Sequence, residues 1–306
     1  MACIKSFERT LHVSSVFFVT GASRGLGRAI AEAALAAGHR VAASARDPKT
    51  LDPLVSQYGD RVHALRLDVT DPAAAQAAVT EAHEVFGRID VAVNNAGQGD
   101  RGSLEDTTIE VFRRQVETNF LGTVYVTKAL VPVMRRQGSG RIIQISSLGG
   151  RIGSPGMTAY QSAKWAVGGF SEALSAEVAP LGIKVTVLEP GGMRTDWAGS
   201  SMATPPVSPP YEDTVGASAR SMAGFEKIAN SDPAKVAQLV LTVASLDEPP
   251  LRILAGSDAF EYGREVWRAR VETDGRWEEL SRSTDHDDAA DSWQQQRGSS
   301  LPDVSG

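Results

Sequence analysis

Three glycines fall within the eight residues 20–27, Thr-Gly-Ala-Ser-Arg-Gly-Leu-Gly, between an apolar run and an alanine-rich segment. The run from Val16 to Val19 predicts a buried strand, and residues 28–37 predict a helix. A strand, a tight glycine turn and a helix N-terminus together form an anion site, because glycine lets the backbone approach a phosphate and the helix presents free N–H groups. An ordinary glycine-rich turn has the same appearance, so this stretch alone leaves two interpretations open.

Strand-like and helix-like segments alternate along the rest of the chain. We expect strands at 40–45, 62–67, 91–93, 141–145, 185–188 and 251–254. We expect helices at 51–58, 71–86, 108–137, 158–180, 232–246 and 257–280. Such alternation with short connections predicts a parallel sheet with helices on both faces. Ligands of these sheets bind beyond the carboxyl ends of the strands, and every motif discussed below lies there or in the following helix.

The chain of 306 residues is predicted to form one large domain with additions. Residues 1–13 are interpreted as an N-terminal arm and residues 14–281 as the domain. Within it, residues 195–229 contain four prolines and are expected to form a partly helical lid over the site. Residues 282–306 are polar and rich in aspartate and glutamine, so we expect a disordered tail.

Composition excludes several classes of protein. A net charge of -6 argues against a general nucleic-acid binder and against a basic membrane-binding patch. Cys3 is the sole cysteine, so no intrachain disulfide can form, which fits a reducing compartment. The five histidines lack metal-ligand spacing. We therefore expect a cytoplasmic protein with no metal, no nucleic-acid partner and no membrane partner.

Six further motifs accompany the glycine turn: Asp68, Asn94-Asn95-Ala96-Gly97, Asn119, Ser147, Tyr160-Gln161-Ser162-Ala163-Lys164, and Pro190-Gly191 followed by Thr195. Together they resemble the short-chain dehydrogenase/reductase family of the compact, non-extended type, over about residues 14–255. The resemblance implies a single α/β domain with a doubly wound, Rossmann-like parallel sheet of about seven strands in the order 3-2-1-4-5-6-7. It also implies an oxidoreductase that acts with a nicotinamide cofactor on a carbonyl or alcohol and forms a homodimer or homotetramer.

Tyr160 and Lys164 are expected to carry the chemistry. Four residues apart on a helix, they share one face. A phenol has a pKa near 10, and bringing it to about 7 needs roughly 4 kcal/mol of preferential stabilisation of the phenolate. The lysine cation and an oxidised nicotinamide could supply that stabilisation. Tyr160 would then act as general acid or base on the substrate oxygen. Without the other motifs, a surface Tyr/Lys pair would be the simpler interpretation.

The resemblance assigns two further residues to catalysis. Ser147 is expected to hydrogen-bond the substrate oxygen. Its neighbour Ser146 is the rival, and strand alternation, which aims the two side chains differently, favours Ser147. Asn119 is expected to hold a water that links Lys164 to solvent, whereas the residue type alone, placed in mid-helix, would indicate a kink.

Two positions bear on the choice of cofactor. The dinucleotide rule places an acidic residue at the end of the second strand, where it binds the ribose 2′-hydroxyl. Ala45 and Arg46 occupy that place, and Arg24 in the glycine turn offers a second guanidinium group. Two cations without a carboxylate suit a 2′-phosphate, which predicts NADP(H) over NAD(H). Asp47, one residue further, is the feature that argues for NAD(H).

The resemblance assigns the remaining cofactor contacts by motif. They comprise the glycine turn, the adenine side, the middle of the sheet, the catalytic pair and the nicotinamide side: Gly21, Ser23, Arg24, Gly25, Leu26 and Gly27; Asp68 and Val69; Asn95, Ala96 and Gly97; Tyr160 and Lys164; and Pro190, Gly191, Met193 and Thr195.

The substrate side is less specific. The lid contains apolar residues such as Trp197, Met202 and Met222, which indicates a hydrophobic substrate or a lid that packs on its own protein. The apolar residues Val124, Val126, Leu130 and Val133 are compatible with a subunit interface or with the core. An NADP(H)-binding sensor or scaffold without turnover is the alternative function, but the complete set Asn119, Ser147, Tyr160 and Lys164 favours the enzyme.

Overall fold

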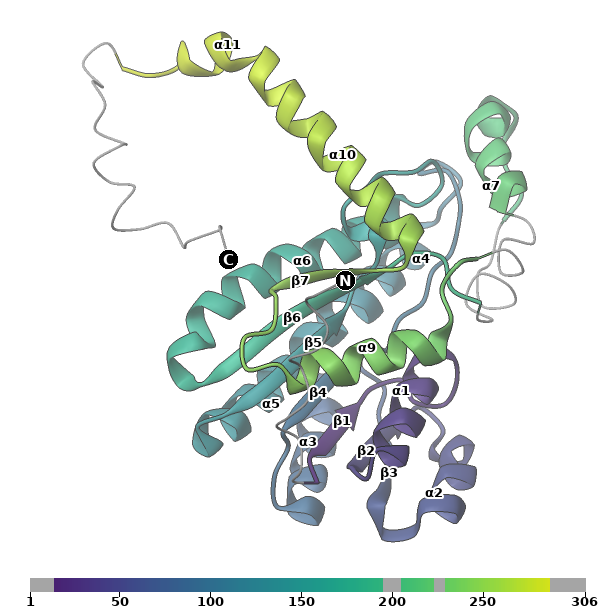
Figure 1. The fold of residues 1–306 in the computed structure, drawn as a ribbon. Helices are drawn as coiled ribbons and strands as arrows, with labels where there is room; N and C mark the ends of the chain where they lie inside the picture. Colours follow the sequence, from purple (N-terminus) through teal and green to yellow (C-terminus); the bar gives the residue numbers. More distant parts are fainter. Residues whose placement is uncertain (1–13, 195–204, 223–228, 287–306) are drawn as a thin grey trace.

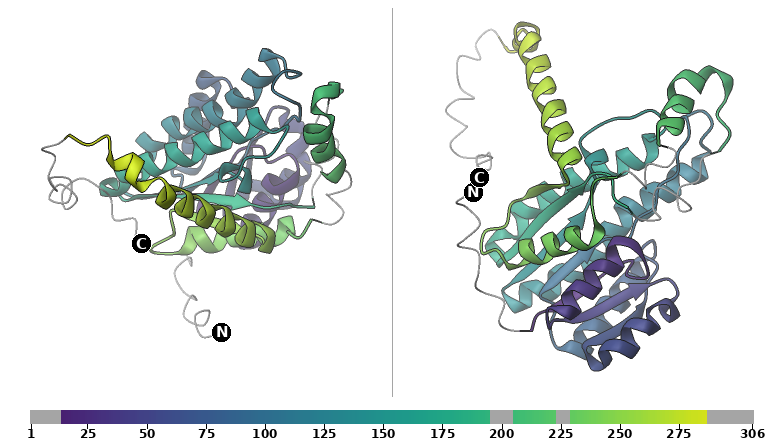
Figure 2. Two further views of the ribbon diagram at one scale, coloured as in Figure 1. Left: turned by 90° about the horizontal axis from the view of Figure 1, so that it is seen from above. Right: turned by 45° about the vertical axis from the view of Figure 1, so that its right-hand side comes forward.

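The computed structural model describes residues 14–194, 205–222 and 229–286. Seven strands of this part form one sheet in the order β3-β2-β1-β4-β5-β6-β7, and every neighbouring pair is parallel. Helices cover both faces of the sheet (Figures 1 and 2). The order and the two helical layers confirm the fold predicted from the sequence.

The strands lie close to their predicted positions. They are β1 (Val16–Val19), β2 (Arg40–Ala45), β3 (Val62–Arg66), β4 (Val91–Asn94), β5 (Gly140–Ile145), β6 (Ile183–Pro190) and β7 (Arg252–Ala255). β1 and β4 are buried along their whole length, and β2, β5 and β6 at all but one residue each, as expected of a parallel sheet covered on both faces. The edge strands β3 and β7 are more exposed. The largest difference is β6, which is longer at both ends than the run 185–188 that was predicted.

The helices are α1 (Gly25–Ala36), α2 (Asp52–Tyr58), α3 (Pro72–Phe86), α4 (Ile109–Val116), α5 (Gly122–Gln137), α6 (Thr158–Val178), α7 (Ala217–Met222), α9 (Pro233–Ser245), α10 (Ser257–Arg276) and α11 (Glu278–Arg282). Two of them begin as predicted from the sequence. Asp71 caps α3 and Asp232 caps α9, each accepting a backbone N–H, with proline at the first helical position.

Two cores lie on opposite faces of the sheet. Phe17 and Phe18 are both fully buried, and because successive strand residues point to opposite faces, they enter different cores. Phe17 packs with residues of α1 and α9, including Ile30 and Val240. Phe18 packs with residues of α3 and α5, including Leu130. The sheet is thereby held rigidly between two helical layers.

Three helical predictions need refinement. The expected helix 108–137 is interrupted by a π-helical turn, Glu117–Leu121, between α4 and α5. The expected final helix ends at Arg276 and is followed by the short α11; α10 extends away from the sheet (Figure 1). The described part of the lid contains a 3-10 turn at Pro209–Tyr211, a π-helical turn at Glu212–Gly216 and α7.

Several predictions fall outside the described residues. These are the arm 1–13, most of the predicted tail, and the lid residues Trp197 and Met202. In the segments that the structure describes, no helix combines the length and the hydropathy needed to cross a membrane.

Candidate active site

A cavity of about 930 Å³ lies at the carboxyl ends of the strands. Because all strands are parallel, the segments that follow β1, β4, β5 and β6 meet at this edge of the sheet. Every residue predicted for the site lines the cavity, with two exceptions. Gly27 packs behind the turn, where an added Cβ would collide with Asn95 and the Gly21 carbonyl, and Thr195 lies outside the described residues.

The glycine turn has the geometry of an anion cradle. Gly21 and Gly25 have φ values of 66° and 58°, in a backbone region that residues with side chains rarely adopt. A Cβ on Gly21 would lie 3.0 Å from the Cα of Ala96, whereas the position over Gly25 is open. Helix α1 begins there with no side-chain cap and no acidic residue in its first turn. Its N–H groups are thus placed for a phosphate, so the residues present fit a dinucleotide.

Asn95 fixes this turn against the end of β4. Its Nδ2 donates to the carbonyl oxygens of Thr20 (3.0 Å) and Gly21 (3.2 Å). The Thr20 hydroxyl in turn accepts the backbone N–H groups of Asn95 (2.9 Å) and Ala96 (3.0 Å). The first and fourth strands therefore hold the turn jointly.

Two cations face the same cavity. Arg24 in the glycine turn and Arg46 at the end of β2 are both exposed and line it. The carboxylate of Asp47 accepts the backbone N–H of Lys49 (3.1 Å) and so caps the following turn. Asp68, at the adenine side, accepts both the N–H and the hydroxyl of Thr70. Asp47, the one carboxylate that argued for NAD(H), therefore caps a turn.

Ser147 and Tyr160 face one another. Their side chains share a hydrogen bond, and the Ser147 hydroxyl also accepts the N–H of Gly149 (3.0 Å). Burial raises the pKa of Tyr160 to about 12, and the bond to Ser147 offsets only part of that rise. The phenol is therefore neutral near pH 7 and able to donate a proton.

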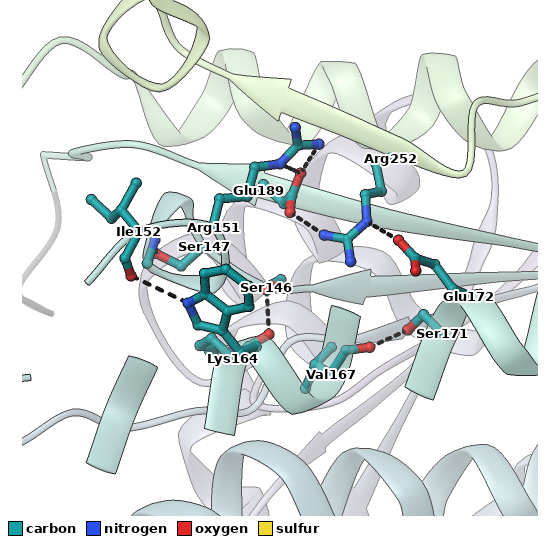
Figure 3. Close-up of polar contacts among 12 residues, drawn as sticks. Ser146, Ser147, Arg151, Ile152, Lys164, Val167, Ser171, Glu172, Glu189 and Arg252 are labelled. Carbon is teal, nitrogen blue, oxygen red and sulfur yellow. Dashed lines mark hydrogen bonds and ion pairs between the residues drawn. The ribbon is translucent and has the colours of Figure 1, made fainter. Parts of the chain in front are cut away.

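Ser146 points elsewhere. Its hydroxyl donates to the carbonyl oxygen of Lys164 (3.2 Å) and so binds the loop to α6 (Figure 3). The alternation of side chains at the end of β5 thus separates the two serines, one towards the helix backbone and one towards Tyr160.

Lys164 lies beneath the tyrosine. Its Nζ donates to the carbonyl oxygen of Ile145 (2.8 Å) and is 5.8 Å from the centre of the Tyr160 ring. Burial lowers the pKa of Lys164 to about 8, because the charged form loses hydration. At neutral pH the ammonium still predominates and places a positive charge near the phenol.

Asn119 sits in the π-helical turn and is fully buried. Its Oδ1 accepts the N–H of Gln98 (3.1 Å), and its Nδ2 donates to the carbonyl oxygens of Gln98 and Gln115 (both 2.8 Å). A Cβ on Gly97 would lie 2.8 Å from Asn119 Oδ1 and 3.6 Å from Lys164 Nζ. Gly97 therefore allows the amide and the ammonium to approach each other, while the predicted water relay stays a prediction.

Asp258 is a site residue that the sequence did not reveal. It comes from the start of α10, and its Oδ2 accepts the N–H of Gly192 (2.8 Å). A Cβ on Gly191 would collide with this carboxylate, so the glycine leaves the space that it occupies. The contact spans 66 residues of sequence, and no local pattern signals it.

Residues 14–194, 205–222 and 229–286 contain no cluster of three or more histidine, cysteine, aspartate or glutamate side chains suited to a metal.

The chain is similar to known proteins over most of its length. A family model described as short chain dehydrogenase matches residues 15–205. Oxidoreductase BOA17 of Botryotinia fuckeliana is 54% identical over 270 residues, which cover 88% of this chain and 98% of that protein.

Solved structures are similar over most of the chain. A short-chain dehydrogenase from Streptomyces avermitilis is 39% identical, with a TM-score of 0.83, and the match covers 90% of this chain and 100% of that one. An alcohol dehydrogenase from the archaeon Thermococcus sibiricus, in complex with 5-hydroxy-NADP, is 27% identical, with a TM-score of 0.66 and coverage of 80% and 97%.

Proposed function

The chain belongs to the short-chain dehydrogenase family, and from this we propose that it interconverts a carbonyl group and a secondary alcohol on a hydrophobic small molecule with NADP(H). Membership of the family makes it an oxidoreductase that uses a nicotinamide cofactor. The proposal is carried by one observation. Ser147 and Tyr160 share a hydrogen bond beside Lys164, in the same cavity as the uncapped N-terminus of α1.

In the proposed reduction, Tyr160 donates its phenolic proton to the substrate oxygen as the carbonyl carbon gains a hydride. A bound reduced nicotinamide supplies that hydride. The Ser147 hydroxyl donates a hydrogen bond to the same oxygen and orients it towards Tyr160. The Lys164 ammonium stabilises the phenolate left on Tyr160. Oxidation of the alcohol reverses each step, with the phenolate as base.

The preference for NADP(H) rests on charge at the end of β2. Arg24 and Arg46 can pair with a 2′-phosphate, and guanidinium groups suit that anion in geometry as well as in charge. The Asp47 carboxylate is bonded to the Lys49 N–H, which leaves it less able to accept the ribose hydroxyl of NAD(H).

The substrate class rests on the described part of the lid. Met222 of α7 lines the cavity together with Ile152 and Met157. Apolar lining of this kind favours a hydrophobic ketone or alcohol.

Substrate screening tests the proposal. Purified protein would be given a panel of aliphatic, aromatic and long-chain ketones with NADPH, and the matching alcohols with NADP+, while absorbance of the reduced cofactor is followed. We expect turnover of apolar members of the panel. Tight NADPH binding without turnover of any member would favour the sensor or scaffold instead.

A further inference from the structure

Glu189 places a carboxylate inside the sheet. It is fully buried in β6, between Leu188 and Pro190, and it is the one acidic residue of that strand. A buried carboxylate is costly unless it is paired and hydrogen-bonded, and an apolar residue at such a position is often the more stable choice. Its presence therefore calls for a reason other than packing.

Two arginines from different elements pair with this carboxylate (Figure 3). Arg151 Nε and Nη2 lie 2.7 Å and 2.6 Å from Glu189 Oε2. Arg252 Nη1 lies 2.7 Å from Glu189 Oε1, and Arg252 Nε lies 2.7 Å from Glu172 Oε1 on α6. Both carboxylate oxygens are thus satisfied, and the four side chains are neutral as a group.

The arginines join different structures to Glu189. Arg151 directly follows the 3-10 turn Leu148–Gly150, and Ser147 is the N-cap of that turn. Arg252 begins β7, and its guanidinium lies against Gly168 of α6, where any Cβ would collide with it. Glu189 itself immediately precedes Pro190-Gly191. Arg151 therefore joins the Ser147 loop to the strand that ends in the Pro190-Gly191 turn, whereas Arg252 joins that strand to α6.

Two further contacts hold the loop and the Arg151 side chain. The Trp165 indole N–H donates to the Ile152 carbonyl oxygen (3.2 Å) and holds the loop from α6 (Figure 3). The Trp267 ring of α10 lies 5.8 Å from the Arg151 guanidinium and covers it. A side chain held on one side by a carboxylate and on the other by an aromatic ring has little freedom to move.

We propose that Glu189 and Arg151 are positioning residues, which fix the Ser147 hydroxyl relative to the Pro190-Gly191 turn. The inference rests on the proposed function, in which Ser147 must hold the substrate oxygen beside the nicotinamide side of the cavity. Displacement of about 1 Å at a reacting centre can cost about a hundredfold in rate.

Arg151→Met and Arg252→Met form a matched pair for the test. Each removes one guanidinium from the same buried carboxylate, and the two arginines are similarly buried, at 17% and 23% exposure. Both variants should lose thermal stability. Only Arg151→Met should also lower kcat, by about tenfold or more, with the Kd for NADPH changed less than twofold. Arg151→Lys, which keeps the charge, should recover part of the loss, and Glu189→Gln should behave like Arg151→Met.

Hydrogen–deuterium exchange provides a readout that needs no substrate. The amides of Gly150, Arg151 and Ile152 bond within the loop, to Ser147 and Leu148 carbonyl oxygens. Their exchange should accelerate at least tenfold in Arg151→Met and remain near the wild-type rate in Arg252→Met. Equal acceleration in both variants, or in neither, would overturn the inference.

The two readouts separate this inference from the proposed function. If the wild-type protein turns over no ketone or alcohol, the proposed function fails, and exchange in the loop still decides whether Arg151 anchors it. If the wild type is active and both methionine variants lose kcat equally, the pairs have a structural role only, and the inference fails while the proposed function stands.

Discussion

Burial pushes Tyr160 and Lys164 towards their neutral forms. It raises the pKa of the phenol to about 12 and lowers that of the ammonium to about 8, because the charged form of each group loses hydration. A phenolate formed during reduction is therefore costly unless the Lys164 charge and the cofactor site stabilise it. We therefore expect Tyr160 to transfer its proton only when cofactor and substrate both fill the cavity.

Removing the Lys164 charge should stabilise the fold. The pKa of Lys164 is 10.5 when unperturbed and about 8 in the folded protein, so at neutral pH burial of the charge costs as much as about 3 kcal/mol. Lys164→Met also loses the bond to Ile145, and we expect a net gain of about 1–2 kcal/mol in the free energy of unfolding at pH 7.

The sign of the pH dependence follows from the lowered pKa. Between about pH 8 and 10.5 the unfolded chain binds more protons at this lysine than the folded one, so the cost shrinks as the pH rises. The advantage of Lys164→Met should therefore be full below pH 8 and largely gone by pH 10.5, in urea titrations at both values. The exposed Lys128→Met is the control. If the Lys164→Met protein is less stable than wild type at pH 7, this account is refuted.

Cofactor choice should depend on Arg46. Arg46→Asp removes one candidate partner of the 2′-phosphate and adds a carboxylate at the end of β2, where it can accept a ribose hydroxyl. We expect the ratio of kcat/KM for NADPH to that for NADH to fall by at least a hundredfold. Arg113→Asp, an exposed change of equal charge on α4, should leave the ratio unchanged. A wild-type enzyme that prefers NADH would contradict the premise.

Local signals identified residues that line the cavity, and missed the more distant residues that contact them. Tyr160, Lys164 and Ser147 belong to short motifs whose spacing is visible in the sequence. Asp258 and Glu189 act through partners on other elements, such as Gly192 and Arg252, and these contacts exist only after the chain has folded. Whether each motif residue performs its assigned role is still a prediction.

At the scale of elements, the N-terminus of α1 is the part most closely fitted to a ligand. Gly25 lines the cavity and has a positive φ, and no atom lies within 4 Å of the position that a Cβ would take. Gly59 has nearly the same φ and equally open surroundings at the end of α2, away from the cavity. The two glycines therefore share a positive φ that disfavours any side chain, and differ in what a methyl group would obstruct.

Alanine variants of these two glycines distinguish an effect on stability from an effect on cofactor binding. Gly25→Ala and Gly59→Ala should each lower the free energy of unfolding by about 1–3 kcal/mol, the cost of a side chain on a backbone with positive φ. Only Gly25→Ala should weaken NADPH binding, by more than tenfold, in titrations followed by cofactor fluorescence. Equal affinity in the two variants would show that the turn does not hold the phosphates.

Sequence patterns located the elements well where one signal dominated. The strand bounds of β1 and β2 agree with the predicted runs, because each run is followed by a polar residue, Thr20 or Arg46. Asn119 in mid-helix indicated a kink, and a π-helical turn lies there, but its extent, Glu117–Leu121, was not predicted, since one extra residue in a turn hardly alters the spacing of apolar side chains. It matters because Asn119 lies within it.

At the scale of the whole molecule, the parallel sheet gathers distant motifs at one edge. The fold order was predictable because the family's motifs occur in the expected sequence and spacing. The oligomeric state was not, since Val126, Leu130 and Val133, which were compatible with an interface, are buried in the core of the single chain. A homodimer or homotetramer is therefore still a prediction, without support from these residues.

The central claim is that Tyr160 exchanges a proton with the substrate oxygen, and Tyr160→Phe tests it most directly. The measurement is kcat for an apolar ketone with NADPH in wild type and variant, with Tyr58→Phe on α2 as the control. We expect kcat to fall by about 10²–10⁴-fold in Tyr160→Phe, with the Kd for NADPH unchanged, because only the hydroxyl is removed. Turnover by Tyr160→Phe at the wild-type rate would contradict the mechanism.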